Sequence, residues 1–187
     1  MDELLLLGVG CLGGLFIGSQ TEYWVHIFMH KRILLGHSHI FHHEEPWDEH
    51  FFQQYKYYLL GWAPMSGAFI LGFWAAGYLL VGLGIAAGGF LWATWVAYAH
   101  TLQHEKPELV FWMRRPIHYI HHTHHLPGYN FGLSVDWWDH VFGTYKAMPW
   151  TCAPRPRWWG LHLLSIHWFK SPPSPSGLWT GEEQPKT

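Results

Sequence analysis

The chain of 187 residues carries a formal net charge of −2, with 13% charged and 19% aromatic residues. This near-neutral charge lacks the basic footprint of a nucleic-acid-binding protein, and the abundance of aromatic residues excludes disorder over most of the chain. The presence of only two Cys excludes a disulfide scaffold. The length favours a single domain, and the residue type that stands out is His, with 17 copies.

Two long stretches, residues 4–21 and 57–99, contain no charged residue. The hydrocarbon core of a membrane is about 30 Å thick and a helix rises about 1.5 Å per residue, so the second stretch is long enough for two crossings. Glycines at residues 82–84 or 88–89 offer a break between those crossings. We therefore predict an all-α, multi-pass integral membrane protein. Its three long helices are expected near residues 3–30, 62–82 and 85–105.

The basic residues predict the orientation of these helices. Lys31, Arg32 and Lys56 lie between the first and second helices, and all remaining Lys and Arg follow the third. The positive-inside rule places both regions on the cytoplasmic side, together with the C-terminal ends of helices one and three. Asp2 and Glu3 precede the first apolar stretch and no basic residue does, which is unlike a cleaved signal peptide.

Three further features concern packing and the C-terminal region. Gly61, Gly67, Gly72 and Gly77 would permit close contact between membrane helices. Residues 158–169, WWGLHLLSIHWF, could form an amphipathic helix lying in the membrane interface or a helix packed on the core. Residues 171–187 are rich in Pro and Ser and are expected to form a disordered tail. Residues 1–170 then form a single membrane-embedded domain.

The histidines fall into two matching arrays. One array reads HIFMH and then HIFHH, and the other reads HTLQH and then HYIHH. Each is a pair at i, i+4 followed by a triplet at i, i+3, i+4, and these offsets place side chains on one face of a helix. Imidazoles one turn apart can chelate a metal ion, and neutral imidazole suits Zn, Cu, Fe and Ni. A structural zinc ion takes four ligands, and the ten histidines of the two arrays are too many for one such ion. The sequence therefore predicts two metal ions. Spacing alone leaves iron and zinc open.

These motifs at the ends of membrane helices resemble the fatty acid hydroxylase / sterol desaturase superfamily. The resemblance covers roughly residues 20–150 and includes the segment NFGLSVDWWDHVFGTYK, which is similar to that family's N-x-G…W-D-x-L-F-G-T-Y motif. Within the superfamily, EYWVHIFMH and HIFHHEEPWDEH most resemble the lipid 2-hydroxylase branch and small bacterial relatives. The chain has one helix before its first motif, where the family commonly has a hairpin.

The resemblance implies a membrane di-iron oxygenase that uses O2 to hydroxylate or desaturate a C–H bond of a membrane lipid, with an acyl chain as the expected substrate. Zinc could occupy the same site in purified protein, and a separate electron-donor protein would supply the two electrons. The implied metal ligands are His26, His30, His39, His42, His43, His100, His104, His118, His121 and His122. His125 would share the face of His121 and His122 if their helix continued, which makes it a further candidate.

Carboxylates near the histidines are candidates for hydrogen bonds to the ligand rings. Glu22 lies one turn before His26 near the membrane edge, where a bond to a ligand histidine or an interfacial salt bridge would explain it. Asp136 and Asp139 are the other candidates, and Asp139 could instead cap a local turn.

Two alternative functions remain open from the sequence. One is an oxygenase that acts on a carotenoid or a sterol-type lipid. The other is a metal-binding membrane subunit of a larger complex, without catalysis.

Overall fold

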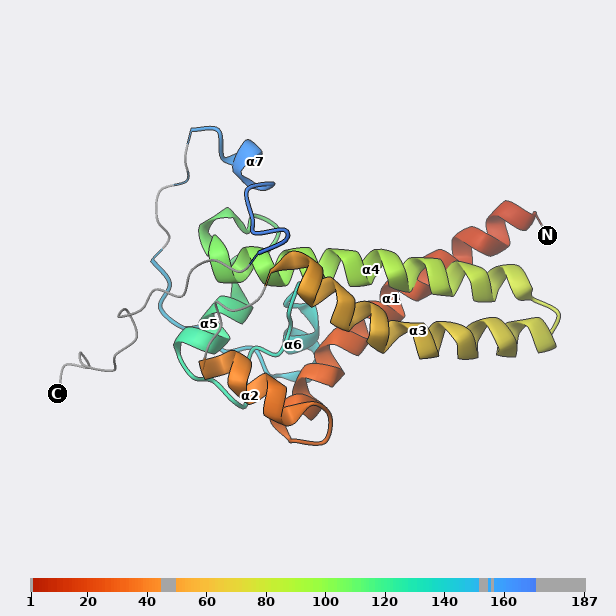
Figure 1. The fold of residues 1–187 in the computed structure, drawn as a ribbon, viewed down its shortest axis with the longest axis horizontal. Coiled ribbons are helices and arrows are strands. Elements are labelled where there is room, and N and C mark those ends of the chain that lie inside the picture. The colour runs from red at the N-terminus through yellow and green to blue at the C-terminus, as the bar shows by residue number, and fades with distance from the viewer. Residues whose placement is uncertain (1, 45–49, 152–154, 156, 171–187) are drawn as a thin grey trace.

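The computed structural model describes residues 2–44, 50–151, 155 and 157–170, and within these residues the chain contains helices and no strands. Three long helices form an elongated bundle, and the shorter elements gather at one of its ends (Figure 1). The helices are α1 (Glu3–His30), α2 (Gly36–Glu44), α3 (Phe51–Ala75), α4 (Leu79–Glu105), the 3-10 helix η1 (Pro107–Leu109), α5 (Ile117–Thr123), α6 (Trp137–Phe142) and α7 (Trp159–His162).

The long helices α1, α3 and α4 contain 28, 25 and 27 residues, and each is long and apolar enough to cross a membrane. At about 1.5 Å per residue they measure roughly 38 to 42 Å, which exceeds the hydrocarbon thickness of about 30 Å. The predicted all-helical membrane fold is confirmed, and α1 has the predicted bounds.

The predicted break between the second and third helices is wrong. The helix expected at residues 62–82 is α3, which starts at Phe51 and ends at Ala75. The chain reverses at residues 76–78, where Gly77 has a φ of +81°. Glycine adopts this left-handed conformation without the steric cost that other residues pay. A single glycine therefore makes the turn, and the glycines at residues 82–89 lie inside α4.

Those glycines instead let α1 and α4 approach closely. A Cβ atom at Gly14 would overlap the carbonyl oxygen of Ile85, and one at Gly88 would overlap that of Cys11. Small residues at such a contact allow the two backbones to pack directly, which stabilises helix pairs in membranes. The glycines with this role are Gly10, Gly14, Gly84 and Gly88.

The glycines that the sequence suggested for close helix contact lie elsewhere. A Cβ at Gly61, Gly67 or Gly72 would meet no atom within 4 Å, so the prediction for them is wrong. The spacing of glycines in α3 did not reveal which face of that helix is packed. Close contact between α3 and α4 is made by two glycines of α4: Gly82 lies against the backbone of α3 at Phe69, and Gly89 lies against the ring of Trp62.

The C-terminal region departs from both expectations for residues 158–169, an interfacial amphipathic helix and a helix packed on the core. Only Trp159–His162 is helical, as α7, and the chain then runs irregularly across the ends of α4 and α3. Ile166 packs into a core cluster with residues of α3, α4 and the loop that precedes α5. The predicted tail, residues 171–187, lies outside the described residues.

We predict that Gly88→Ala destabilises the protein by about 1–3 kcal/mol, because the added methyl group forces α1 away from α4. Thermal unfolding of the purified protein in detergent measures the effect. Gly72→Ala is the matched control, since its methyl group has open space in the same kind of helix. Equal unfolding temperatures for the two variants would contradict the close packing of α1 on α4.

Candidate metal centre

The two histidine pairs lie at the last turns of two membrane-length helices. His26 and His30 end α1, and His100 and His104 lie at the end of α4. These helix ends lie at the same end of the bundle (Figure 1). An i, i+4 pair projects from one face of a helix, so each helix presents two imidazoles to the space between α1 and α4.

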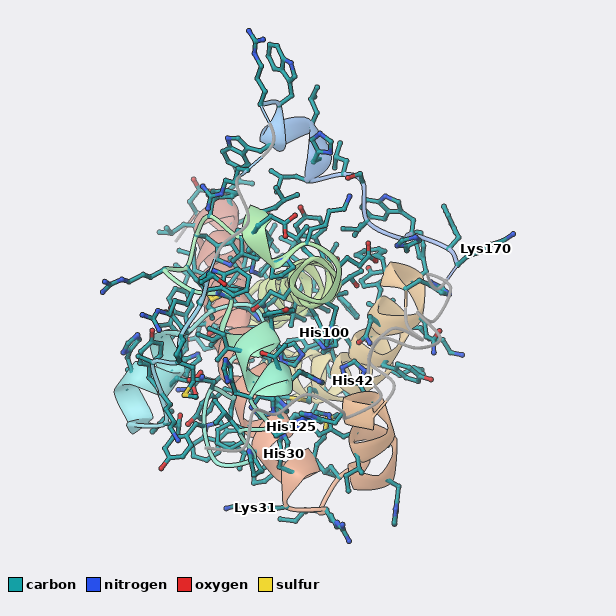
Figure 2. All side chains as sticks on the ribbon, turned by 90° about the vertical axis from the view of Figure 1, so that its left-hand side faces the viewer. His30, Lys31, His42, His100, His125 and Lys170 are labelled. Atoms are coloured by element: carbon teal, nitrogen blue, oxygen red, sulfur yellow. The ribbon has the colours of Figure 1, made fainter. Side chains whose placement is uncertain are left out.

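The two histidine triplets lie on short helices packed over these ends. His39, His42 and His43 belong to α2, and His118, His121 and His122 belong to α5. After α1 the chain turns back through Arg32 and Leu35, both of which have positive φ angles of 58° and 45°. This turn brings α2 back beside the end of α1. When the molecule is viewed from this end, His42 and His100 lie near its centre and His30 lies below them, toward Lys31 (Figure 2).

Five histidines form the first group, which we call site 1. The Nε2 atom of His30 lies 3.2 Å from that of His26, 3.0 Å from that of His39 and 2.8 Å from that of His121. The ligand nitrogens of the whole group lie within 4.8 Å of one another. Site 1 consists of His26, His30, His39, His43 and His121.

Four histidines form the second group, site 2, and their ligand nitrogens also lie within 4.8 Å of one another. The Nε2 atom of His104 lies 3.1 Å from that of His118 and 3.2 Å from that of His100, which borders the group. Site 2 consists of His42, His104, His118 and His122. The two sites adjoin, since the rings of His43 and His122 stack with centroids 3.9 Å apart.

Each triplet contributes to both sites. In α2 the i, i+4 pair His39 and His43 belongs to site 1, and His42 belongs to site 2. In α5 the i, i+4 pair His118 and His122 belongs to site 2, and His121 belongs to site 1. The middle histidine of each HxxHH motif therefore belongs to the other site, and α2 and α5 together bridge the two groups.

Burial keeps these rings neutral. It lowers the pKa of His121 to about 3 and that of His118 and His122 well below the ordinary value of 6.5, and neighbouring histidines lower them further. Neutral imidazole is the form that binds metal ions. Among the described residues, both ring nitrogens of His122 and Nδ1 of His100 and His118 are buried without a hydrogen-bond partner. Because such burial is costly, a metal ion that accepts the lone pair of His122 Nε2 fits the site.

A loop between α5 and α6 fixes two rings of site 1. The carbonyl oxygen of Phe131 lies 2.7 Å from Nδ1 of His26, and that of Tyr129 lies 2.7 Å from Nδ1 of His121. A ring N–H that donates to a carbonyl places the proton on Nδ1 and leaves Nε2 free as a metal ligand. The loop therefore sets the orientation of both imidazoles from the side opposite the site.

Asp139 holds this loop. Its carboxylate accepts hydrogen bonds of 2.8 Å from the backbone N–H groups of Phe131 and Gly132, and one of 2.7 Å from Thr144 Oγ1. Asp139 contacts no ring of site 1 in these hydrogen bonds, and it acts on His26 through the backbone of Phe131. The sequence left two roles open for Asp139, a hydrogen bond to a ligand ring or the capping of a local turn. Its direct contacts are those of a residue that caps a local turn.

Glu22 makes contacts that differ from both sequence-based expectations. Its buried carboxylate accepts hydrogen bonds from the backbone N–H and the hydroxyl of Ser134 and from Nε1 of Trp92. These bonds join α1, α4 and the loop before α6, in place of a bond to a ligand histidine or a salt bridge. Asp136 pairs with His140 at 3.5 Å, away from both sites.

His125 lies outside both groups. The helix that was expected to carry it onto the face of His121 ends at Thr123, and His125 itself has a positive φ of 48°. Its side chain is exposed. The sequence predicted a ligand role for His125 only if the helix of His121 continued to it. Since α5 ends before His125, this condition is not met.

Gln103 and Asn130 hold the backbone around the sites and were not predicted from the sequence. Gln103 is fully buried, its Oε1 accepts a hydrogen bond from the backbone N–H of His118, and its Nε2 donates to the carbonyl of Leu133. Asn130 pairs with the backbone of Lys146 through both atoms of its amide. A polar amide inside the apolar α4 pattern, next to His104, was the available signal for Gln103.

Comparison with known proteins agrees with this geometry. The family model described as fatty acid hydroxylase matches residues 11–144, which is well over half of the chain. No curated protein and no solved structure matches the chain. The matched region runs from within α1 through both histidine triplets and α6 to Thr144. The chain therefore belongs to the fatty acid hydroxylase family.

Proposed function

We propose that this protein is an O2-dependent di-iron oxidoreductase that hydroxylates or desaturates a C–H bond of a membrane lipid, with an acyl chain as the substrate. The observation that carries this proposal is the pair of adjoining, buried imidazole groups at the ends of membrane-length helices. Membership of the fatty acid hydroxylase family supports the reaction class. We further propose that the active site faces the cytoplasm, as the distribution of basic residues predicts.

The proposed ligands are the nine histidines of sites 1 and 2 together with His100, which borders site 2. The absence of Cys from both sites excludes an iron–sulfur centre there, and imidazole ligands suit iron. Bound iron would supply the activation of O2, and a separate electron-donor protein would supply electrons. Zinc also suits imidazole ligands and competes for the same positions during purification.

The chain itself contributes geometry and exclusion of water. His118 and His121 are completely buried, and His26 is only 1% exposed. The α2 and α5 helices cover the site from outside the bundle, whereas α1 and α4 continue from it into the membrane. A lipid chain that approaches from the bilayer would meet the site from the side of α1 and α4. Oxidation of an unactivated C–H bond needs such protection of the reacting species from water.

We predict that His121→Ala reduces bound metal from about two equivalents to about one and abolishes lipid oxidation, because it removes a ligand from site 1. Elemental analysis of anaerobically purified protein measures the metal, and lipid profiling of expressing cells measures the product. His162→Ala is the control and should retain both properties, since the exposed His162 of α7 lies outside both groups.

Three outcomes would count against the proposal. Full metal content and full turnover in His121→Ala would refute the ligand assignment. Bound metal without O2 consumption or any change in lipids would indicate a non-catalytic metal-binding subunit. Altered carotenoids or sterols, with unchanged acyl chains, would replace the acyl substrate by the other lipid class.

We predict that Asp139→Asn weakens metal binding at site 1 about tenfold, because outer hydrogen bonds that orient a ligand are typically worth 10- to 100-fold in metal affinity. The amide presents one acceptor oxygen where the carboxylate presents two, so one of the bonds to Phe131 and Gly132 is lost. Titration with a chelator should remove one equivalent early and leave the other as in the parent protein. Asp136→Asn, in the same loop, is the control, and identical titrations for both variants would contradict this role.

A further inference from the structure

Two segments at the histidine end of the bundle expose large apolar side chains. The first is the turn after α1, residues 31–35, in which Ile33 and Leu35 are each 65% exposed. The second is residues 157–170, which include α7 and in which Leu161, Leu164 and Phe169 are 74%, 68% and 75% exposed. We call these two segments together the collar. Side chains of this size seldom gather in contact with water unless they bind something.

The second segment is fixed in place by its backbone. The carbonyl of Leu163 accepts a hydrogen bond from the hydroxyl of Tyr98, and that of Ser165 accepts one from Nζ of Lys106. The carbonyl of His167 accepts one from the N–H of Phe51. These bonds tie the segment across the end of α4 and the start of α3. Its outward side chains are therefore presented by a fixed backbone.

The collar lies at the level where the spanning helices leave the membrane. Phe51 is the first residue of α3, and Lys106 directly follows α4. Since these helices are roughly 10 Å longer than the hydrocarbon core is thick, their ends extend into the headgroup layer. In the view toward this end of the molecule, Lys31 and Lys170 lie at its edge, whereas His42 and His100 lie nearer its centre (Figure 2).

The collar is also basic. Lys31 and Arg32 precede the exposed aliphatic residues of the first segment, and Arg157 and Lys170 flank those of the second. The described residues of these two segments include no Asp or Glu. The guanidinium of Arg157 lies 5.9 Å from the ring centroid of Trp158, which is itself exposed. Exposed Trp and Leu beside Arg and Lys are typical of segments that lie in a membrane interface.

We propose that the collar rests on the bilayer surface, with its apolar side chains among the upper acyl chains and its basic residues on anionic lipid headgroups. This contact fixes the depth of the protein and keeps sites 1 and 2 at the headgroup level. It depends on the membrane-spanning helices and not on any bound metal. The proposed contact of the collar with the bilayer would therefore hold even if the metal proposal failed.

Spin labelling of the full-length protein tests this proposal. A nitroxide is attached to Leu161→Cys or Ile33→Cys in a Cys11→Ala, Cys152→Ala background, and each protein is reconstituted in phosphatidylcholine with or without phosphatidylserine. Accessibility to O2 reports the lipid phase, and accessibility to a water-soluble nickel chelate reports water. Both labels should be accessible to O2 and shielded from nickel, and more strongly so with phosphatidylserine.

Gly128→Cys is the matched control, because this exposed position lies in the turn after α5 with no atom within 4 Å of its Cβ direction. Its label should be accessible to nickel in both lipid mixtures. Replacing Arg157 and Lys170 by Gln should reduce the effect of phosphatidylserine on the accessibility of the Leu161 label. Each charge removed should weaken the partition of the segment onto the anionic surface by about fivefold. This variant leaves the core contact of Ile166 intact.

Two results would overturn the proposal. Nickel accessibility at residues 33 and 161 equal to that at residue 128 would place the collar in water, where a protein partner could bind it. Equal shielding in both lipid mixtures, with no effect of the Gln replacements, would exclude the anionic headgroups as its partner.

Discussion

Burial of imidazole rings beside a membrane is the constraint on which the rest of this structure depends. A neutral ring has one donor and one acceptor nitrogen, and each loses water when it is buried. Site 1 satisfies the donors of His26 and His121 with backbone carbonyls and leaves the acceptor nitrogens facing one another. That arrangement is unfavourable without an ion between the rings. The same arrangement makes the site a strong ligand set for a metal.

The packing of α1 against α4 and the placement of α2 and α5 bring the histidine rings together. The close approach of α1 and α4 through Gly14 and Gly88 sets the distance between the helices that end in the histidine pairs. Each HxxHH motif then splits between the sites, so α2 and α5 are each held by both groups. A shift of either short helix would disturb ligands in both sites at once. The two histidine groups are therefore coupled through the short helices that cover them.

The two sites are supported differently by their surroundings. In site 1, the loop containing Tyr129 and Phe131 orients two rings, and Asp139 anchors the loop. In site 2, the backbone of His118 is held by Gln103, but Nδ1 of His118 and of His122 has no hydrogen-bond partner among the described residues. A ring with a fixed tautomer and orientation loses less freedom when it binds a metal. The geometry therefore preorganises site 1 more than site 2.

The membrane class, the helical fold and the histidine motifs could be predicted from the sequence, because apolar length and histidine spacing are local properties of the chain, and the resemblance of the motifs predicted the family. The position of the turn between α3 and α4, at Gly77, could not be predicted, because several glycines in the same apolar stretch were equally able to end a helix. The assignment of each ring to its site, and the hydrogen bond from Ser134 to Glu22 in place of one from a histidine, became visible only in the packed molecule. These are contacts between residues far apart in the chain, and they depend on how α1, α4 and the loop before α6 pack in space.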